Sequence, residues 1–327
     1  MTKNLVSVII VNWNGKKWLK KCLDSLLNQT YKQFEIILID NASSDDSAKY
    51  IKKNYPHTRL VINKKNLGLT RAINQGVKLS KGEFLLIVNN DTWVDRNFIE
   101  RLYQFYSEHS FAVIAPQEKR YDKTQDFKCN TTIDPTGSPV YFVPTYSRPD
   151  KLFYLSVCFF CSKKAYLESR GLDNNFFMYH EDVDWFWRLS LLGKKFAYVN
   201  NVFIYHAGAG STGRGIKYNT FLWRNQNTLQ ALIKNYSTLV MLFILPVYFT
   251  QNLLEMLFFI LIMKPKIASS YINGWIFNVK YLKRTFGERR WVQKNRKIGD
   301  MEILRKMYLG PGKLFLLNSY LSSKNGK

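Results

Sequence analysis

The sequence predicts an α/β fold in which helices cover a mostly parallel central sheet. Over the first 90 residues, short apolar runs rich in β-branched residues alternate with segments whose apolar residues recur at helical spacing. This alternation is typical of β-α-β units. Three of the runs end in polar residues, at Asn12, Asp40 and Asn89–Asp91. Because ligands of such sheets bind at the carboxyl ends of the strands, we expect a nucleotide site there.

Each predicted element follows from its own stretch of sequence. Continuous apolar runs predict strands over residues 5–11, 34–39, 59–62 and 84–88. Apolar residues at helical spacing predict helices over residues 16–28, 48–54 and 69–79. The polar residues 43–46 are typical of an N-cap for the second helix. Strand and helix patterns resume at 153–168, a helix is expected over 182–192, and a strand over 196–205 leads into His206 and a glycine loop.

Composition limits the classes of protein. Hydrophobic residues make up 46% of the 327 residues, which excludes a disordered polybasic chain. Lys and Arg number 48 against 24 Asp and Glu, a formal net charge of +24. That charge predicts an anionic partner, which could be nucleic acid, nucleotide phosphates or an anionic membrane.

The cysteines and the N-terminus indicate a reduced, cytoplasmic protein. Cys158 and Cys161 form a CxxC motif inside an apolar strand pattern, where residues three apart face opposite sides. No second CxxC completes a zinc site, so we interpret this pair as core residues. The N-terminal apolar run over residues 5–11 is too short for a signal peptide and ends in a turn.

Residues 239–262 form the most apolar stretch, with 19 apolar residues in 24. The length could span a bilayer. However, Pro246 interrupts the stretch, and a spanning helix would bury Glu255 in hydrocarbon. We therefore expect two apolar helices that lie in or dip into one leaflet. A true span and a soluble core or oligomer interface are the alternatives.

The C-terminal residues 263–327 carry 15 Lys and Arg against 3 Asp and Glu, interleaved with aromatic residues. Basic residues beside aromatic side chains favour an anionic headgroup layer. A solvated basic face or a nucleic-acid patch is the alternative. We expect a catalytic domain over 1–235 and a membrane-associating helical region over 236–327, which would place the protein on the cytoplasmic face of the membrane as a peripheral or monotopic protein.

Three groups of polar residues could carry chemistry. Asn89–Asp91 follow an apolar strand and could hold Mg²⁺ or Mn²⁺ together with substrate phosphates, although such residues also make ordinary turns. Glu181, Asp182 and Asp184 open a predicted helix, where they could cap it or supply a general base. His206 could be a metal ligand or a structural histidine.

The order of these motifs resembles family 2 glycosyltransferases with a GT-A fold, particularly their rhamnosyltransferase-like branch. The matching segments are VSVIIVNWNG (6–15), IDNASSDDS (39–47), NLGLTRAINQGVKLSKGEFLLIVNNDTWVD (66–95) and FMYHEDVDWFWRLSLLGKKFAYV (177–199). The resemblance covers about residues 5–230 and implies polysaccharide biosynthesis at the cell envelope. It implies a nucleotide-sugar donor, and a glycan acceptor that we expect to be lipid-linked.

The resemblance also implies roles for single residues. Asp40 would recognise the base or ribose, with Asp45 as a weaker candidate, and Asn66 and Arg71 would lie beside the nucleotide together with Asn12. Asn89, Asn90 and Asp91 occupy the place of the DxD motif, from which Asn89 departs. Asp91 and His206 would bind the divalent metal. Asp182 would be the catalytic base, with Glu181 and Asp184 as alternatives.

We therefore predict an inverting, metal-dependent glycosyltransferase, because a base opposite the leaving diphosphate permits single displacement. A nucleotidyltransferase is one rival, but it would favour a basic glycine-rich loop where residues 12–15 read Asn-Trp-Asn-Gly. A non-catalytic nucleic-acid-binding protein is the other, and its binding would fall steeply with salt. Nucleic acid is the least favoured partner, and an oligomer is compatible with every interpretation.

Overall fold

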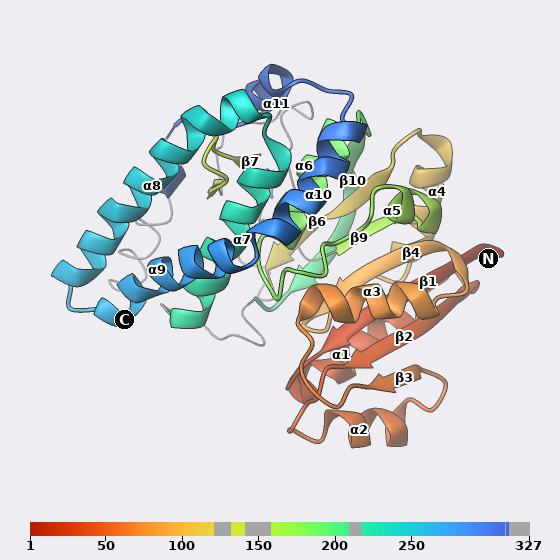
Figure 1. The fold of residues 1–327 in the computed structure, drawn as a ribbon. Helices are drawn as coiled ribbons and strands as arrows, with labels where there is room; N and C mark the ends of the chain where they lie inside the picture. The colour runs from red at the N-terminus through yellow and green to blue at the C-terminus, as the bar shows by residue number, and fades with distance from the viewer. Residues whose placement is uncertain (121–131, 141–157, 209–216, 311, 314–327) are drawn as a thin grey trace. The chain divides into compact units, whose positions relative to one another are not determined.

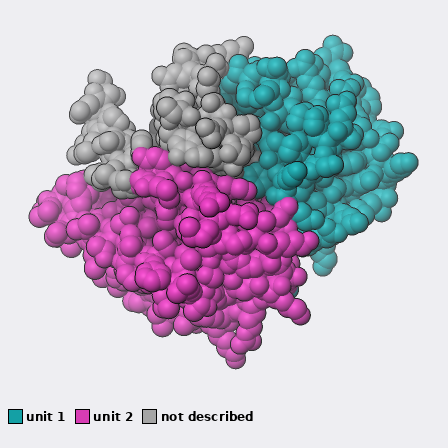
Figure 2. All heavy atoms as spheres, turned by 90° about the horizontal axis from the view of Figure 1, so that it is seen from above, with its two compact units in different colours: residues 1–129, 155–177, 194–213 teal, residues 130–154, 178–193, 214–327 magenta. Residues whose placement is uncertain are grey.

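The computed structural model of the chain describes all residues except 121–131, 141–157, 209–216, 311 and 314–327 (Figure 1). The chain forms two compact units whose segments alternate along the sequence (Figure 2). The first unit contains residues 1–129, 155–177 and 194–213. The second contains residues 130–154, 178–193 and 214–327.

An eight-stranded mixed sheet is the centre of the first unit. Its strand order is β3-β2-β1-β4-β9-β6-β10-β5. The first four are parallel, and they confirm the four strands expected in the N-terminal part: β1 (Thr2–Asn12), β2 (Phe34–Asp40), β3 (Arg59–Ile62) and β4 (Gly82–Asn89). The remaining strands are β5 (Thr92–Val94), β6 (Val113–Arg120), β9 (Cys158–Ser162) and β10 (Phe196–His206). β9 is antiparallel to both β4 and β6, β6 is parallel to β10, and β10 is antiparallel to β5.

The sheet curls, and this curvature builds the site. Only Asn90 and Asp91 separate β4 from β5, yet β5 lies four places further along the sheet. Four strand spacings in a flat sheet would measure about 19 Å. The three Cα steps from Asn89 to Thr92 reach at most about 11 Å. The edge strand must therefore fold back toward the end of β4, which brings β10 beside the Asn90–Asp91 turn.

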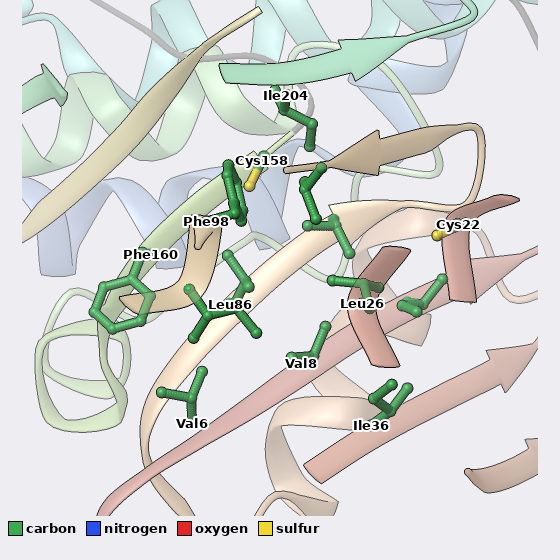
Figure 3. Close-up of a cluster of buried hydrophobic side chains, with 14 of the residues drawn as sticks. Val6, Val8, Cys22, Leu26, Ile36, Leu86, Phe98, Cys158, Phe160 and Ile204 are labelled. Atoms are coloured by element: carbon green, nitrogen blue, oxygen red, sulfur yellow. The ribbon is translucent and has the colours of Figure 1, made fainter. Parts of the chain in front are cut away.

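Helices and the sheet bury a continuous core in the first unit (Figure 3). The helices predicted over 16–28, 48–54 and 69–79 agree to within a residue or two with α1 (Lys16–Leu27), α2 (Ser47–Asn54) and α3 (Leu69–Leu79). The unit also contains α4 (Phe98–Glu108) and α5 (Lys163–Glu168). Helix α3 packs closely because a Cβ at Gly76 would lie 2.5 Å from Ile9. Of the residues 43–46 expected to cap α2, Asp46 has φ +60° and makes no side-chain cap, while Asp45 accepts from the backbone of Ser47, the first residue of the helix, at 3.2 Å.

The cysteine interpretation is confirmed for the three cysteines that the structure describes. Cys22, Cys158 and Cys161 are buried free thiols. Cys22 and Cys158 belong to the core cluster drawn in Figure 3, and Cys161 lies outside that cluster. Burial raises the pKa of each thiol, so these side chains act as small apolar residues.

The second unit is mainly helical. It contains a short hairpin and six helices among the described residues: β7 (Thr132–Ile133), β8 (Pro139–Val140), α6 (Glu181–Leu191), α7 (Tyr218–Asn235), α8 (Thr238–Leu261), α9 (Pro265–Lys280), α10 (Leu282–Asn295) and α11 (Asp300–Lys306). Helix α7 packs against α6, α9 and α10, and its residues 227–235 are all buried.

The apolar stretch forms one helix, so the expected pair of helices is wrong. Helix α8 continues through Pro246 from Thr238 to Leu261. Among the described residues it is the one helix whose length and mean hydropathy of 1.6 would suffice to cross a membrane. Two of its polar residues point into the protein, because Asn252 is fully buried and Glu255 accepts hydrogen bonds from the Tyr271 hydroxyl and the Lys313 ammonium, both at 2.8 Å.

Candidate functional site

Polar side chains at the carboxyl ends of β1, β2 and β4 form one hydrogen-bonded cluster. The Asn12 amide donates to Asp40 Oδ1 at 3.0 Å, and Asn12 Oδ1 accepts from the Asn90 amide at 2.6 Å. The second Asp40 oxygen accepts from the Ser43 backbone at 3.1 Å. All three side chains are buried. Parallel register places Asn12 opposite Asp40, which explains why residues separated by 28 positions meet.

Gly15 is required by this cluster. A Cβ at this position would lie 2.0 Å from Asn90 Nδ2 and 2.6 Å from Asn12 Oδ1. Any side chain would therefore displace the amide that joins β1 to the turn after β4. The loop after β1 must carry glycine for a steric reason rather than for backbone freedom.

Asn41 was missed by the sequence reading, and it orders the loop before α3. Its amide donates to Asn66 Oδ1 at 2.8 Å, and its oxygen accepts from the Leu67 backbone at 3.0 Å. Asn66 Oδ1 also accepts from the Gly68 backbone at 2.9 Å. Asn66 thus shapes the loop that precedes α3, whatever it contacts in a bound ligand. The only sequence signal was the position of Asn41 directly after a strand end.

Three further predicted residues have defined places in the first unit. Asp45 accepts from the Lys16 backbone at 2.9 Å and from Ser47, so it joins the loops after β1 and β2. Arg71 is exposed on α3 and donates to the Asn174 carbonyl at 2.9 Å. The Asn89 carbonyl accepts from the Thr92 hydroxyl at 2.6 Å and fixes the turn that carries Asp91.

Asp91 and His206 meet at the curled edge of the sheet. His206 Nε2 lies 3.2 Å from Asp91 Oδ1, and His206 Nδ1 lies 2.6 Å from Glu118 Oε1. Burial alone would lower the pKa of His206, but hydrogen bonds to the two carboxylates raise it to about 10. The glycine loop expected after His206 lies largely outside the described residues.

The Asp91–His206 pair fits a divalent cation. Two neighbouring ligands of a six-coordinate Mg²⁺ lie about 3.0 Å apart, close to the observed separation of the two donor atoms. In the part of the chain that the structure describes, no three His, Cys, Asp or Glu side chains surround one point. Among the described residues, Asp91 and His206 therefore offer one oxygen and one nitrogen, and that nitrogen has to release its proton as the metal binds.

In the second unit, the turn before α6 has a strained backbone. Tyr179 and His180 both have positive φ, at 69° and 64°, a conformation that costs energy in residues other than glycine. Helix α7 holds this turn in place: the Asn227 amide donates to the carbonyls of Met178 and Tyr179 at 2.9 and 2.7 Å. The Thr228 hydroxyl lies 2.9 Å from His180 Nε2. Burial lowers the pKa of His180 to about 4, so its ring is neutral near pH 7.

Glu181 and Asp182 follow the strained turn with little compensation of their charge. Burial raises the pKa of Asp182, and the Arg224 guanidinium partly opposes that rise. Burial and the nearby Asp182 raise the pKa of Glu181 as well. Asp182 Oδ1 accepts from the Val183 backbone at 2.8 Å. Glu181 Oε2 is buried and has no hydrogen-bond partner among the described residues.

Asp184, only two residues further, has the opposite environment. Its fully buried carboxylate pairs with Arg188 Nε at 2.9 Å and Lys234 Nζ at 3.0 Å, and accepts from the Asn235 amide at 3.1 Å. A proton-accepting role would have to break both ion pairs. This geometry supports a structural role for Asp184 and leaves Asp182 and Glu181 as the better candidates for a base.

A small cavity of about 50 Å³ lies in the second unit beside the turn before α6. His180 and Arg224 line it together with aromatic side chains of α7, α8 and α9: Phe221, Tyr248, Phe259 and Tyr271. Arg224 also lies 5.1 Å from the centre of the Tyr179 ring. Arg224 thus lines this cavity and also interacts electrostatically with the Asp182 carboxylate.

Comparison with known proteins connects the N-terminal half of the chain, which carries the strand-end cluster, to a family. Residues 7–173, about half of the chain, match the sequence model of glycosyl transferase family 2. Glycosyltransferase GlyA of Streptococcus pneumoniae is 34% identical over 106 residues, 32% of this chain and 15% of that protein. The matched segment thus spans less than half the length of this relative.

A second relative covers more of the chain. The UDP-Glc:alpha-D-GlcNAc-diphosphoundecaprenol beta-1,3-glucosyltransferase WfaP of Escherichia coli is 28% identical over 251 residues, 73% of this chain and 91% of that protein. Among solved structures, GalNAc-T7 with UDP, GalNAc and Mn²⁺ aligns with a TM-score of 0.56 and 17% identity, over 70% of this chain and 48% of that one. This likeness confirms the GT-A-like fold.

Proposed function

Because the chain belongs to glycosyl transferase family 2, we propose that it transfers a sugar from a nucleotide-sugar donor to a hydroxyl of a glycan acceptor. The observation that carries the proposal is the meeting of Asn12, Asp40, Asn90, Asp91 and His206 at one edge of the sheet. Three strand ends and the curled edge contribute to it, at the place where α/β sheets bind ligands. We retain the rhamnosyltransferase-like branch as a prediction about the sugar.

Asp91 and His206 would hold a divalent Mg²⁺ or Mn²⁺ in the donor site. When bound, such an ion neutralises the negative charge that develops on the leaving nucleoside diphosphate. Asn12 and Asn90 keep the Asp91 turn in one conformation through their 2.6 Å hydrogen bond. Asn66 is joined to the residue after β2 by its hydrogen bond from Asn41, and Arg71 follows in the first turn of α3. We propose that both lie beside the nucleotide.

Asp182 is our candidate for the catalytic base, and the expected outcome is inversion at the anomeric carbon. A base works best when its pKa lies near the working pH, and burial shifts the pKa of Asp182 upward in that direction. The backbone hydrogen bond from Val183 and the charge of Arg224 oppose this rise in pKa. Glu181 is a second candidate, whereas the ion pairs of Asp184 favour a structural role.

The acceptor is proposed to be lipid-linked, as the name of WfaP, a diphosphoundecaprenol glucosyltransferase, indicates for that relative. Helix α8 supports a membrane-associated acceptor, because its outer face exposes large apolar side chains, among them Leu239, Leu242, Phe243, Leu254, Leu257 and Leu261. Helix α9 adds Ile272, Ile276 and Val279. Exposed apolar surface of this extent, next to Lys264 and Lys266, favours an anionic membrane surface.

The inward direction of the α8 polar residues favours a helix that lies in the interface. Glu255 is bonded to Tyr271 and Lys313, and the Gln251 oxygen accepts from the Thr136 hydroxyl at 2.9 Å. A helix with one packed polar face and one apolar face suits the membrane plane. We therefore propose a catalytic region over 1–235 and a monotopic region over 236–327 on the cytoplasmic face.

A donor screen tests the proposal. Release of nucleoside diphosphate would be measured with uridine, thymidine and guanosine diphospho-sugars, with Mn²⁺, Mg²⁺ or EDTA, and with lipid-linked glycan acceptors. We expect one donor to give acceptor-dependent release that EDTA abolishes. Release of pyrophosphate from a nucleoside triphosphate and a sugar phosphate would instead identify a nucleotidyltransferase. Full activity in EDTA would contradict the proposed metal dependence and would leave the proposed sugar transfer in place.

A further inference from the structure

Glu118 lies behind His206, on the side of the ring that faces away from Asp91. We propose that Glu118 is a positioning residue: it holds the His206 ring so that Nε2 faces Asp91 and the divalent metal. The inference rests on the proposed metal-dependent transfer and adds to it a residue that no sequence motif indicated.

Strand pairing fixes Glu118 and His206 with respect to each other. β6 runs parallel to β10, and Glu118 is the register partner of Ile204, two residues before His206. On its other side β10 pairs with β5, where His206 is opposite Thr92. The Ala207 backbone also donates to the Asp91 carbonyl at 3.0 Å. The histidine is therefore held by backbone on both sides, and only rotation of its ring remains to be restricted.

The hydrogen bond to Glu118 supplies that restriction. Glu118 Oε1 lies 2.6 Å from His206 Nδ1, while Nε2 lies 3.2 Å from Asp91 Oδ1. The Glu118 and His206 side chains are each 15% exposed and that of Asp91 is 7% exposed, so water competes weakly for these contacts. An Nδ1–H that donates to Glu118 makes Nε2 the nitrogen that gives up its proton and takes the metal when the ion binds.

Such carboxylates behind metal-bound histidines have a measurable effect. They orient the ring and make it a stronger ligand, and their loss weakens metal binding by roughly 10–100-fold. A merely structural Glu118 would stabilise the β6–β10 pair and leave metal affinity unchanged. The two roles therefore differ in a binding measurement that does not depend on catalysis.

The test is Mn²⁺ affinity, measured by electron paramagnetic resonance on the full chain with nucleoside diphosphate present. Glu118→Ala should raise the Kd for Mn²⁺ by roughly 10–100-fold, and Glu118→Gln, which keeps an acceptor but loses the charge, should raise it less. Glu83→Ala and Glu83→Gln are the matched controls, because Glu83 is a half-buried carboxylate of the same sheet that accepts from the Asn4 backbone at 3.0 Å. The controls should bind Mn²⁺ like the unmodified chain.

A second readout follows the ring itself. The chain has only 4 histidines, so imidazole ¹⁵N spectra of the Cd²⁺-loaded protein can be assigned by single substitutions. We expect His206 to carry its proton on Nδ1 in the unmodified chain and to lose that preference in Glu118→Ala.

Unchanged Mn²⁺ affinity in folded Glu118→Ala, with binding lost in Asp91→Asn, would overturn the positioning role and leave the proposed function intact. An unmodified chain that transfers sugar in EDTA and binds no Mn²⁺ would overturn the positioning role together with the metal.

Discussion

The carboxylates at the strand ends of the first unit and those that open α6 in the second unit differ in how their charge is compensated. Asp40 accepts from Asn12 and Ser43, and Asp91 pairs with His206. In α6, Asp184 forms ion pairs with Arg188 and Lys234, whereas Asp182 has a backbone hydrogen bond from Val183 and a more distant interaction with Arg224. Burial raises the pKa of both Glu181 and Asp182.

This difference separates binding from proton transfer. Carboxylates with fixed partners are held in one orientation, which suits the capture of a phosphate-bound metal. A buried carboxylate with few partners takes up a proton near neutral pH, which suits a general base. Asp182 and Asp184 show these two environments on one helix, two residues apart. Substitutions in the two regions should therefore have different consequences.

The largest stability effect is expected at Asp184. Asp184→Ala leaves Lys234 and Arg188 buried without their carboxylate, and the free energy of unfolding should fall by about 3–5 kcal/mol. Denaturant unfolding measures this loss. Glu168→Ala is the control, because the exposed Glu168 makes only surface ion pairs, and its effect should stay below about 1 kcal/mol. Equal losses in the two variants would contradict a structural role for Asp184.

A smaller effect is expected at Gly15, which packs against the hydrogen-bonded cluster of Asn12, Asp40 and Asn90. The added Cβ of Gly15→Ala collides with Asn90 Nδ2, and such overpacking lowers the free energy of unfolding by about 1–3 kcal/mol. Nucleotide affinity should also fall, because the Asn12–Asn90 bond is displaced. Gly287→Ala in α10 has no neighbour within 4 Å and should gain about 0.5–1 kcal/mol. Unchanged nucleotide binding in Gly15→Ala would show that this cluster is not part of the donor-binding site.

Membrane binding should respond to single apolar residues of α8. Phe243 is 70% exposed, and burying a side chain of this size contributes about 1.5–3 kcal/mol, so Phe243→Ser should weaken partition onto anionic vesicles by at least about tenfold. Leu167→Ser is the control, because Leu167 is 57% exposed on α5, in the other unit. Vesicle co-sedimentation measures both variants. Equal binding by both variants would exclude α8 as the membrane face.

The smallest expected change is a shift of the pH profile. Transfer requires ionised Asp182, whose pKa burial raises to about 7, so the rate should rise with pH through that value. Arg224 lowers this pKa, so Arg224→Met should move the rising limb to higher pH, and Arg224→Lys should move it less. A limb that stays in place in Arg224→Met would show that another group controls the profile.

The sequence predicted the parts that depend on local pattern. Strands such as 34–39 and helices such as 69–79 were predicted because apolar periodicity decides them, and the ends of strands pointed to Asn12, Asp40 and Asp91. Three features depend on distant partners instead. Glu118 meets His206 across 88 positions, Thr228 holds the strained turn before α6 across 48, and Asn41 acts through a loop after the next strand. No local pattern marks such contacts.

The prediction of two helices over 239–262 was wrong for the opposite reason, because there a local pattern did not decide the structure. Pro246 predicted a break, yet the helix continues through it. Packing of Tyr248, Asn252 and Phe259 against the protein holds the following turns, and tertiary contacts of this kind override helix propensity.

The most direct test of the central claim is single-turnover transfer by Asp182→Asn. With the identified donor and acceptor, we predict a rate loss of roughly 10²–10⁴-fold. Affinity for the nucleoside diphosphate should remain unchanged, because the residues proposed to bind the nucleotide-sugar donor lie in the first unit and Asp182 lies in the second. Near-normal transfer by Asp182→Asn, with Glu181→Gln inactive, would move the base to Glu181. Near-normal transfer by both variants would contradict the assignment of the base to α6.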